Sequence, residues 1–306
     1  MSNMQTGTTI SVSHLAKSFG SAHAVNDVSF DVHTSEIFGL LGPNGAGKTT
    51  SIRMILDIFK PDKGTVSILG GAMNEAKKSK VGYLPEERGL YKDMKVEECV
   101  LYLAELKGLS RNIARKRAAE YFDMLDLTAH KNKKVNDLSK GMQQKVQVII
   151  TLLHQPPLII IDEPFSGLDP VNTRLIQEML MVERDRGTSI IMSTHLMHQV
   201  EEMCDRIVLI DKGNTVLYGG VDEIRRRYAD NSVRVSVRGE LPAIPGVIET
   251  ERKGNLHTLR LPTDMPPPSL LHILADTPSI VIESFELAIP TMDDIFVRVV
   301  SGEQEA

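Results

Sequence analysis

Hydrophobic and polar positions alternate along the chain with two periods, and each change of period marks a predicted element. Strand-like alternation opens at Ile10 and Val12 and continues over residues 25–32. The apolar run 37–41 follows, and helical spacing of apolar residues then begins over 52–59. This order predicts β-structure at the N-terminus and a buried strand that leads directly into a helix.

The middle of the chain repeats this succession of strands and helices. Residues 65–69 follow a Pro-Asp-Lys-Gly turn and predict a short strand, whereas 96–125 is strongly charged with apolar residues at helical spacing. Short apolar strands return at 158–161 and 189–192, each followed by a polar loop and a helical pattern. Strands that alternate with helices predict an α/β fold with a parallel, helix-covered sheet, interrupted by a helical insert at about 90–155.

The pattern of hydrophobic and polar residues changes again after residue 230. Alternating valines over 233–237 predict a strand, and Lys253-Gly254-Asn255 predicts a hairpin turn. Thr291, with Asp294 three residues later, is typical of a helix N-cap. We therefore expect a large domain over 1–230 and a small α+β accessory domain over 231–306 with no catalytic signal of its own.

Length, composition and charge narrow this picture. A length of 306 residues suits roughly two domains, and no apolar stretch approaches the ~20 residues that span a bilayer. The polar N-terminus lacks the apolar core of a signal peptide, so we expect a cytoplasmic protein. Cys99 and Cys204 are too few for a zinc cluster and predict two inert thiols. A net charge of −5 argues against nucleic acid as the main partner.

The junction between the strand at 37–41 and the following helix carries a phosphate-binding pattern. It fits G-x-x-x-x-G-K-[ST] with Gly42-Pro43-Asn44-Gly45-Ala46-Gly47-Lys48-Thr49, and we extend the predicted ATP contacts to Thr50. Glycines let backbone N–H groups close around a polyphosphate, and the helix N-terminus adds partial positive charge. Lys48 is predicted to hold the β- and γ-phosphates, and the Thr49 hydroxyl to ligate Mg²⁺.

A second chemical signal lies at the end of the buried strand 158–161, where Asp162 and Glu163 are adjacent. In a phosphate-loop protein, the first carboxylate can bind Mg²⁺ through its water shell, and the second can act as general base for an attacking water. Taken alone, the pair could equally be solvated acids at a strand end. The loop Pro164-Phe165-Ser166-Gly167-Leu168-Asp169 that follows favours the catalytic interpretation.

Further motifs complete an order that resembles the nucleotide-binding subunits of ABC transporters. These motifs are the signature-like Leu138-Ser139-Lys140-Gly141-Met142-Gln143-Gln144 before the carboxylates and Ser193-Thr194-His195 after them. The matching elements run from about residue 11 to 228. The resemblance implies an ABC ATPase core with an N-terminal antiparallel β part and a helical insert, and it implies ATP and Mg²⁺ as cofactors.

The same resemblance implies roles for residues outside the phosphate loop. Ser139 and Gly141 would begin a helix that is predicted to run to about His154, and its tip would face the ATP of a partner subunit. Two chains would then sandwich two nucleotides in a twofold homodimer or heterodimer. Asp169 would communicate across that interface. His195 would contact the γ-phosphate and keep Glu163 in register, although it could be an ordinary loop histidine. A metal pair of His195 with His198 is disfavoured because further ligands are lacking.

Four positions need separate treatment. Phe19 occupies the place of the aromatic ring that stacks on adenine in the family, or it is an ordinary core residue. Glu86 replaces the usual glutamine of the Q-loop; a carboxylate there could approach Mg²⁺, but it would add negative charge near Glu163. In the signature, Lys140 replaces a glycine and Met142 a glutamine, and Lys140 could meet the partner's phosphate or face solvent.

These departures, together with Glu87-Arg88-Gly89-Leu90-Tyr91 and the extra C-terminal domain, make the chain resemble the export-type branch that includes sodium-exporter and drug-exporter ATPases. We expect an ATPase subunit, peripheral on the inner face of the cell membrane, that drives export through a separate permease by ATP-dependent dimer closure. The permease would dock between the helical insert and residues 86–91. The alternatives are a soluble ABC ATPase that acts on ribosomes or DNA, and a degenerate regulator that does not hydrolyse ATP. The sequence leaves the transported substrate open.

Overall fold

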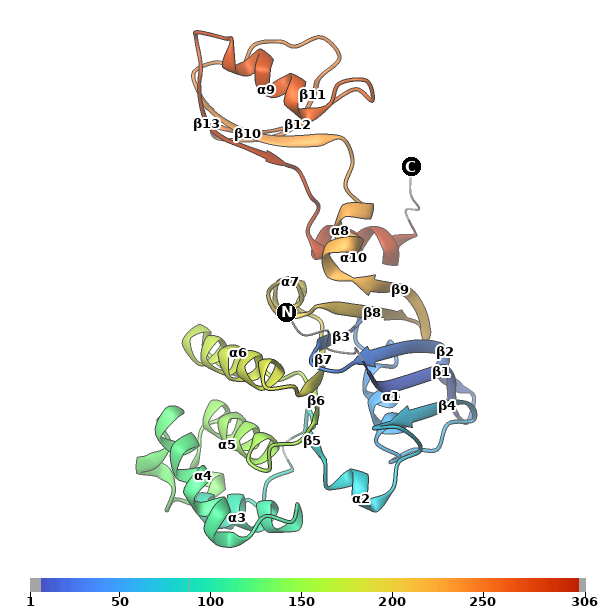
Figure 1. The fold of residues 1–306 in the computed structure, drawn as a ribbon, viewed down its shortest axis with the longest axis vertical. Helices are drawn as coiled ribbons and strands as arrows, with labels where there is room; N and C mark the ends of the chain where they lie inside the picture. Colours follow the sequence, from blue (N-terminus) through green and yellow to red (C-terminus); the bar gives the residue numbers. More distant parts are fainter. Residues whose placement is uncertain (1–6, 88, 303–306) are drawn as a thin grey trace. The chain divides into compact units, whose positions relative to one another are not determined.

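A computed structural model describes residues 7–87 and 89–302, and the chain divides into two compact units between Val221 and Asp222 (Figure 1). Within the described residues, the first unit holds a nine-stranded sheet of order β4-β1-β2-β9-β8-β3-β7-β6-β5. Its strands are β1 (Thr8–Phe19), β2 (Ala22–His33), β3 (Ile37–Leu41), β4 (Lys63–Ile68), β5 (Val81–Leu84), β6 (Leu158–Asp162), β7 (Ser189–Thr194), β8 (Arg206–Asp211) and β9 (Asn214–Gly220). Its helices are α1 (Lys48–Ile55), α2 (Glu75–Lys78), α3 (Val96–Leu106), α4 (Arg111–Met124), α5 (Lys140–Leu152), α6 (Pro170–Asp185) and α7 (Met197–Met203).

The central strands β8, β3, β7, β6 and β5 are parallel neighbours, whereas β1 pairs antiparallel with β2 and β4. The register sets Leu41 opposite Thr194 and Asp162 opposite Ser193. Because parallel strands end at the same edge of a sheet, the loops after β3, β6 and β7 come together there. The predicted α/β core with an antiparallel β part is confirmed.

The helical insert consists of α3, α4 and α5, which pack on one another, with α5 also against β5. Gly108 has a φ of 88°, and the chain reverses there between α3 and α4. Lys107 ties the insert to the sheet because its Nζ donates to the carbonyls of Lys78 and Val81, both at 2.9 Å. The third helix, α5, ends at Leu152, slightly before the predicted end near His154.

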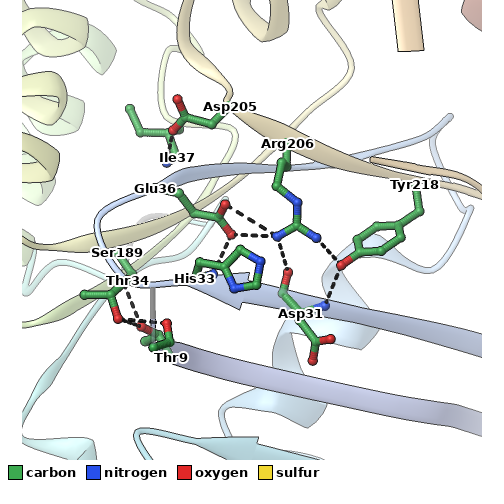
Figure 2. A network of polar contacts seen from close by, with 11 residues as sticks. Thr9, Asp31, His33, Thr34, Glu36, Ile37, Ser189, Asp205, Arg206 and Tyr218 are labelled. Atoms are coloured by element: carbon green, nitrogen blue, oxygen red, sulfur yellow. Dashed lines mark hydrogen bonds and ion pairs between the residues drawn. The ribbon is translucent and has the colours of Figure 1, made fainter. Parts of the chain in front are cut away.

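The start of β3 is fixed by a polar network at the edge of the sheet opposite those loops (Figure 2). Glu36 is only 6% exposed, and its Oε1 accepts hydrogen bonds from the backbone N–H of His33 and from Arg206 Nη1 at 3.2 Å. Arg206 also donates to the Asp31 carbonyl and to the Tyr218 hydroxyl, which in turn accepts from the Asp31 N–H. A buried carboxylate needs such partners. The network therefore anchors the strand that leads into the phosphate loop.

The second unit contains an antiparallel sheet of order β11-β12-β10-β13. Its core is formed by valines of β10 with leucines of β12 and α9, and the predicted hairpin turn at 253–255 is confirmed. Thr291 and Asp294 form a full capping box at the start of α10, as predicted. The elements are α8 (Val221–Arg227), β10 (Ser232–Arg238), β11 (Ile248–Lys253), β12 (Leu256–Arg260), α9 (Pro267–Ala275), β13 (Val281–Leu287) and α10 (Met292–Ser301).

Across residues 7–87 and 89–302, no helix has both the length and the apolar character needed to cross a bilayer.

Candidate active site

The loop between β3 and α1 has a backbone shape that only glycine permits at two positions. Gly42 has a φ of 145°, and a Cβ there would stand 2.1 Å from the Ile210 carbonyl oxygen. Gly47 has a φ of 110°, and its Cβ would meet the Ala24 oxygen at 2.5 Å. Gly47 is also the N-cap of α1 and offers no side chain to the free N–H groups of the first turn. Those groups are available to an anion.

Lys48 begins α1 and is almost fully buried, at 7% exposed. Its Nζ donates to the carbonyl oxygens of Gly42 at 2.8 Å and Pro43 at 3.2 Å. Burial lowers the pKa of Lys48, while the charges of Glu163, Asp162 and Glu86 act in the opposite direction. The ammonium group thus lies inside the loop, in a low-dielectric place where a phosphate oxygen would strengthen its charged form.

Asp162 ends β6 and is 1% exposed. Its Oδ2 accepts a hydrogen bond from Thr49 Oγ1 at 2.9 Å, and its Oδ1 accepts one from Ser193 Oγ. The sequence alone predicted no role for the Ser193 hydroxyl. The signal that could have found it is a polar residue at the carboxyl end of a buried parallel strand, next to the strand that carries the acids.

Glu163 lies one residue beyond β6 in the left-handed region, with a φ of 51°. Its N–H donates to the Ser193 carbonyl at 3.1 Å, and its Oε1 lies 2.8 Å from His195 Nδ1. When Glu163 is ionised, this contact requires a proton on His195 Nδ1, because an ionised carboxylate has only acceptors. Left-handed backbone at a non-glycine residue costs free energy and often marks a functional site.

A pocket of about 330 Å³ lies in front of these groups. Its lining residues are Ala24, Asn44, Gly45, Gly47, Lys48, Thr49, Thr50, Glu86, Asp162 and Glu163. The structure therefore brings the phosphate loop together with both predicted carboxylates and with Glu86, which is exposed at the rim. Among the described residues, this lining does not include Phe19, Ser139, Gly141, Asp169 or His195.

The chain is similar in sequence to known ABC transporter ATP-binding proteins. Over 299 residues the chain is 38% identical to the ABC transporter ATP-binding protein YhaQ of Bacillus subtilis (strain 168), covering 97% of this chain and 100% of that protein. The chain belongs to the family of ABC transporter ATP-binding proteins. Members of this family are ATPases coupled to transport. The resemblance to ABC transporter nucleotide-binding subunits predicted from the sequence is therefore confirmed.

Other matches agree with this family assignment. Residues 25–166 match the ABC transporter model, and residues 219–300 match the C-terminal domain of DrrA1-3-like ATP-binding proteins. The Nod factor export ATP-binding protein I of Burkholderia orbicola (strain AU 1054) is 35% identical over 209 residues, which cover 67% of this chain and 69% of that protein. A solved structure of an ATP-binding subunit of an ABC transporter superposes with a TM-score of 0.68 at 33% identity, covering 72% of this chain and 93% of that chain.

The signature segment of this ABC protein forms the N-terminus of α5. Ser139 is the N-cap, and its Oγ accepts a hydrogen bond from the Met142 N–H at 3.2 Å. The helix tip is held against the loop after β6, because Gln144 Nε2 donates to the Pro164 carbonyl at 2.8 Å and a Cβ on Gly141 would lie 3.1 Å from the Gly167 oxygen. Ser139 and Lys140 are exposed. The tip is thus fixed in its own chain and open to an external anion.

Asp169 has a local structural role that the sequence analysis did not assign. It is the N-cap of α6, with Pro170 at the first helical position, and its carboxylate accepts hydrogen bonds from the Asn172 N–H at 3.0 Å and from the Asn172 side chain. These bonds from Asn172 lower the pKa of Asp169. Its predicted role across a subunit interface stays a prediction.

Phe19 ends β1 and is 45% exposed, so one part of its ring is open to a ligand. The ring meets Phe59 edge-on with centroids 5.3 Å apart, and Lys17 Nζ lies 5.7 Å from its centroid. Asp62 holds the adjacent backbone, since its carboxylate accepts from Lys17 Nζ and from the Ser18 N–H, both at 2.7 Å. Phe59 lies beyond the end of α1 at Ile55, although helical spacing was predicted to reach it.

The donor set of the pocket fits Mg²⁺ bound together with a nucleotide. Mg²⁺ takes hard oxygen ligands and is usually held by one or two carboxylates and the substrate phosphates, with water completing the shell. Thr49 and Asp162 present oxygens that already lie 2.9 Å apart, and Glu86 borders the same pocket. No group of three His, Cys, Asp or Glu side chains suited to a metal occurs within the described residues.

Proposed function

We propose that this ABC protein hydrolyses ATP between two copies of itself and thereby powers export through a separate membrane permease, working at the inner face of the cell membrane. The observation that carries the proposal is the pairing of Thr49 with Asp162 and of His195 with Glu163 in front of the phosphate loop. The Nod factor export relative and the DrrA-like match of the C-terminal unit support an export direction.

In the proposed reaction, water attacks the γ-phosphorus in line and the bond to the β–γ bridging oxygen breaks, giving ADP and phosphate. Glu163 accepts the proton of the attacking water, while His195 keeps its carboxylate in place through Nδ1 and contacts the γ-phosphate. Lys48 stabilises charge on the β- and γ-phosphates. Mg²⁺, held with the help of Thr49 and Asp162, neutralises phosphate charge when it is bound.

The proposed subunit pairing is supported by where the two anion-binding helix ends lie. The α1 end faces the pocket, whereas the tip of α5 at Ser139 does not line it. Each chain holds both halves of a site, so two copies in a head-to-tail arrangement complete two sites and form a closed twofold dimer. Phe19 then offers its open ring to adenine. Asp169 lies at the end of the loop after β6, which contacts the tip of α5.

The permease is proposed to dock beside the loop after β5, on a tyrosine pair of the helical insert. Tyr91 and Tyr102 meet edge-on with ring centroids 5.5 Å apart, yet they remain 47% and 40% exposed. Leu106, on the same helix as Tyr102, is 62% exposed. Exposed aromatic rings next to an apolar residue are typical anchors of a protein interface. The fitting partner is a short cytoplasmic helix with one apolar face.

We expect Tyr102→Ala to weaken permease binding without slowing ATP hydrolysis by the isolated subunit. Loss of an aromatic anchor typically costs about 2 kcal/mol, or roughly 30-fold in Kd. The measurement is the amount of membrane permease that co-purifies with each variant from cell membranes, together with the ATPase rate of the free chain. Met124→Ala removes a comparably exposed apolar side chain from α4 and should leave both unchanged. Undiminished co-purification of Tyr102→Ala would contradict the docking proposal.

A further inference from the structure

Strand β7 carries a buried serine that contacts both acidic residues of the site. Ser193 is 0% exposed and follows the apolar run 190–192 in the centre of the sheet. Its Oγ donates to Asp162 Oδ1, and its carbonyl oxygen accepts from the Glu163 N–H at 3.1 Å. One residue of β7 therefore holds the side chain of the first acid and the backbone of the second.

Both oxygens of the Asp162 carboxylate have hydroxyl donors. Thr49 Oγ1 donates to Oδ2 at 2.9 Å. Ser193 Oγ, on the neighbouring strand β7, donates to Oδ1. Two donors from separate elements fix both the rotamer and the plane of a carboxylate, and hydrogen bonds to the charged form favour that form. When Thr49 turns its hydroxyl to a cation, Ser193 is the donor that still holds Asp162.

We propose that Ser193 is a positioning residue for the divalent cation: its hydroxyl keeps the Asp162 carboxylate in the orientation that receives Mg²⁺. This rests on the proposed function, in which Asp162 takes part in binding the cation. Residues that orient a metal ligand typically contribute 10- to 100-fold to metal affinity. Ser193 does not touch the nucleotide in this proposal, so nucleotide affinity without metal does not depend on it.

The same strand supplies a matched control. Ser189 begins β7, is also 0% exposed, and its Oγ is hydrogen-bonded at 2.8 Å to Thr9 Oγ1, as Figure 2 shows. It lies at the opposite edge of the sheet from the pocket, because β7 runs from Ser189 to Thr194. Ser189→Ala therefore removes a buried hydroxyl from the same strand without changing the surroundings of Asp162.

The test uses the full chain and a fluorescent, slowly hydrolysed ATP analogue. Its affinity is measured over a series of Mg²⁺ concentrations and in EDTA, and Mn²⁺ bound to the protein–nucleotide complex is counted by electron paramagnetic resonance. We expect Ser193→Ala to raise the Mg²⁺ concentration for half-maximal tightening by about 10-fold or more, with unchanged affinity in EDTA. Ser189→Ala should match the unsubstituted chain. An unshifted Mg²⁺ requirement in Ser193→Ala would overturn the proposal.

Two further variants make the outcome unambiguous. Ser193→Cys keeps the size of the side chain with a weaker donor, and it replaces Ser193→Ala if that variant fails to fold; its expected shift has the same direction and is smaller. Asp162→Asn tests the underlying proposal separately. If Asp162→Asn shifts the Mg²⁺ requirement and neither Ser193 variant does, only the role of Ser193 is wrong. If Asp162→Asn also causes no shift, the metal assignment itself is wrong.

Discussion

Glu163→Gln is expected to bind ATP normally and to hydrolyse it about 10²- to 10⁴-fold more slowly, because the amide cannot accept the proton of the attacking water. The site should keep its shape in this variant, because a glutamine fits where the Glu163 carboxylate lies 2.8 Å from His195 and the hydrogen bond from the residue 163 N–H to the Ser193 carbonyl is unaffected. Steady-state phosphate release measures the rate, and light scattering with ATP should show dimers that accumulate because hydrolysis no longer reopens them.

A matched control for this substitution lies on α6. Glu183 is a buried carboxylate, 5% exposed, whose Oε1 pairs with Arg186 at 2.7 Å. Glu183→Gln removes a charge of similar burial away from the pocket and should leave turnover within a factor of about two, although it can lower stability. Full turnover in Glu163→Gln would remove Glu163 from the role of general base.

Lys48→Met is expected to lose both ATP binding and hydrolysis. Hydrogen bonds to charged groups contribute about 1.5–3 kcal/mol each, so loss of the phosphate contacts should weaken ATP binding by roughly 100-fold or more. Folding should survive, because methionine fills the same space and removes an ammonium group that burial disfavours. Equilibrium binding of a fluorescent ATP analogue and thermal unfolding measure the two expectations.

Lys107 provides a close match for Lys48. It too is a lysine at least half-buried whose Nζ donates to two backbone carbonyls, and burial lowers its pKa. It joins the helical insert to β5, however, and is not part of the phosphate loop. Lys107→Met should therefore retain ATP affinity. Equal loss of affinity in both variants would show that the effect of Lys48→Met is structural.

The phosphate loop and the paired acids could be predicted because they are local. Gly42, Gly47 and Lys48 act through the backbone and helix end that they themselves form, and Asp162 and Glu163 are adjacent at the end of one apolar strand. Periodicity likewise predicted the α/β core. Predicting the α/β core requires only the order of strands and helices, which the hydrophobic period of short sequence windows reveals.

Contacts between distant strands could not be predicted in the same way. The bond from Ser193 to Asp162 depends on the register of β7 against β6, and the pair of Glu36 with Arg206 joins positions 170 residues apart. Neither follows from spacing in one sequence. The cap that Asp169 provides for α6 was missed for another reason: its local signal, an acid before proline, was interpreted as an interface residue.

The central claim is that one ATP lies between the phosphate loop of one chain and the Ser139 helix tip of another, and mixing two inactive variants tests it most directly. Lys48→Met destroys the loop and leaves the tip intact, whereas Ser139→Arg does the reverse. Thr291→Arg also places arginine at a helix N-cap, that of α10 in the second unit, and should remain active by itself. It shows whether losing a helix cap by itself explains the inactivity of Ser139→Arg.

In a mixed dimer, one site combines both defects and the other combines an intact loop with an intact tip. Equal mixing should therefore restore about a quarter of the unsubstituted ATPase rate, since half of the dimers are mixed and each has one complete site of two. The account predicts this recovery when the two purified variants are combined with Mg²⁺ and ATP. A mixture no faster than the two variants measured apart would contradict it.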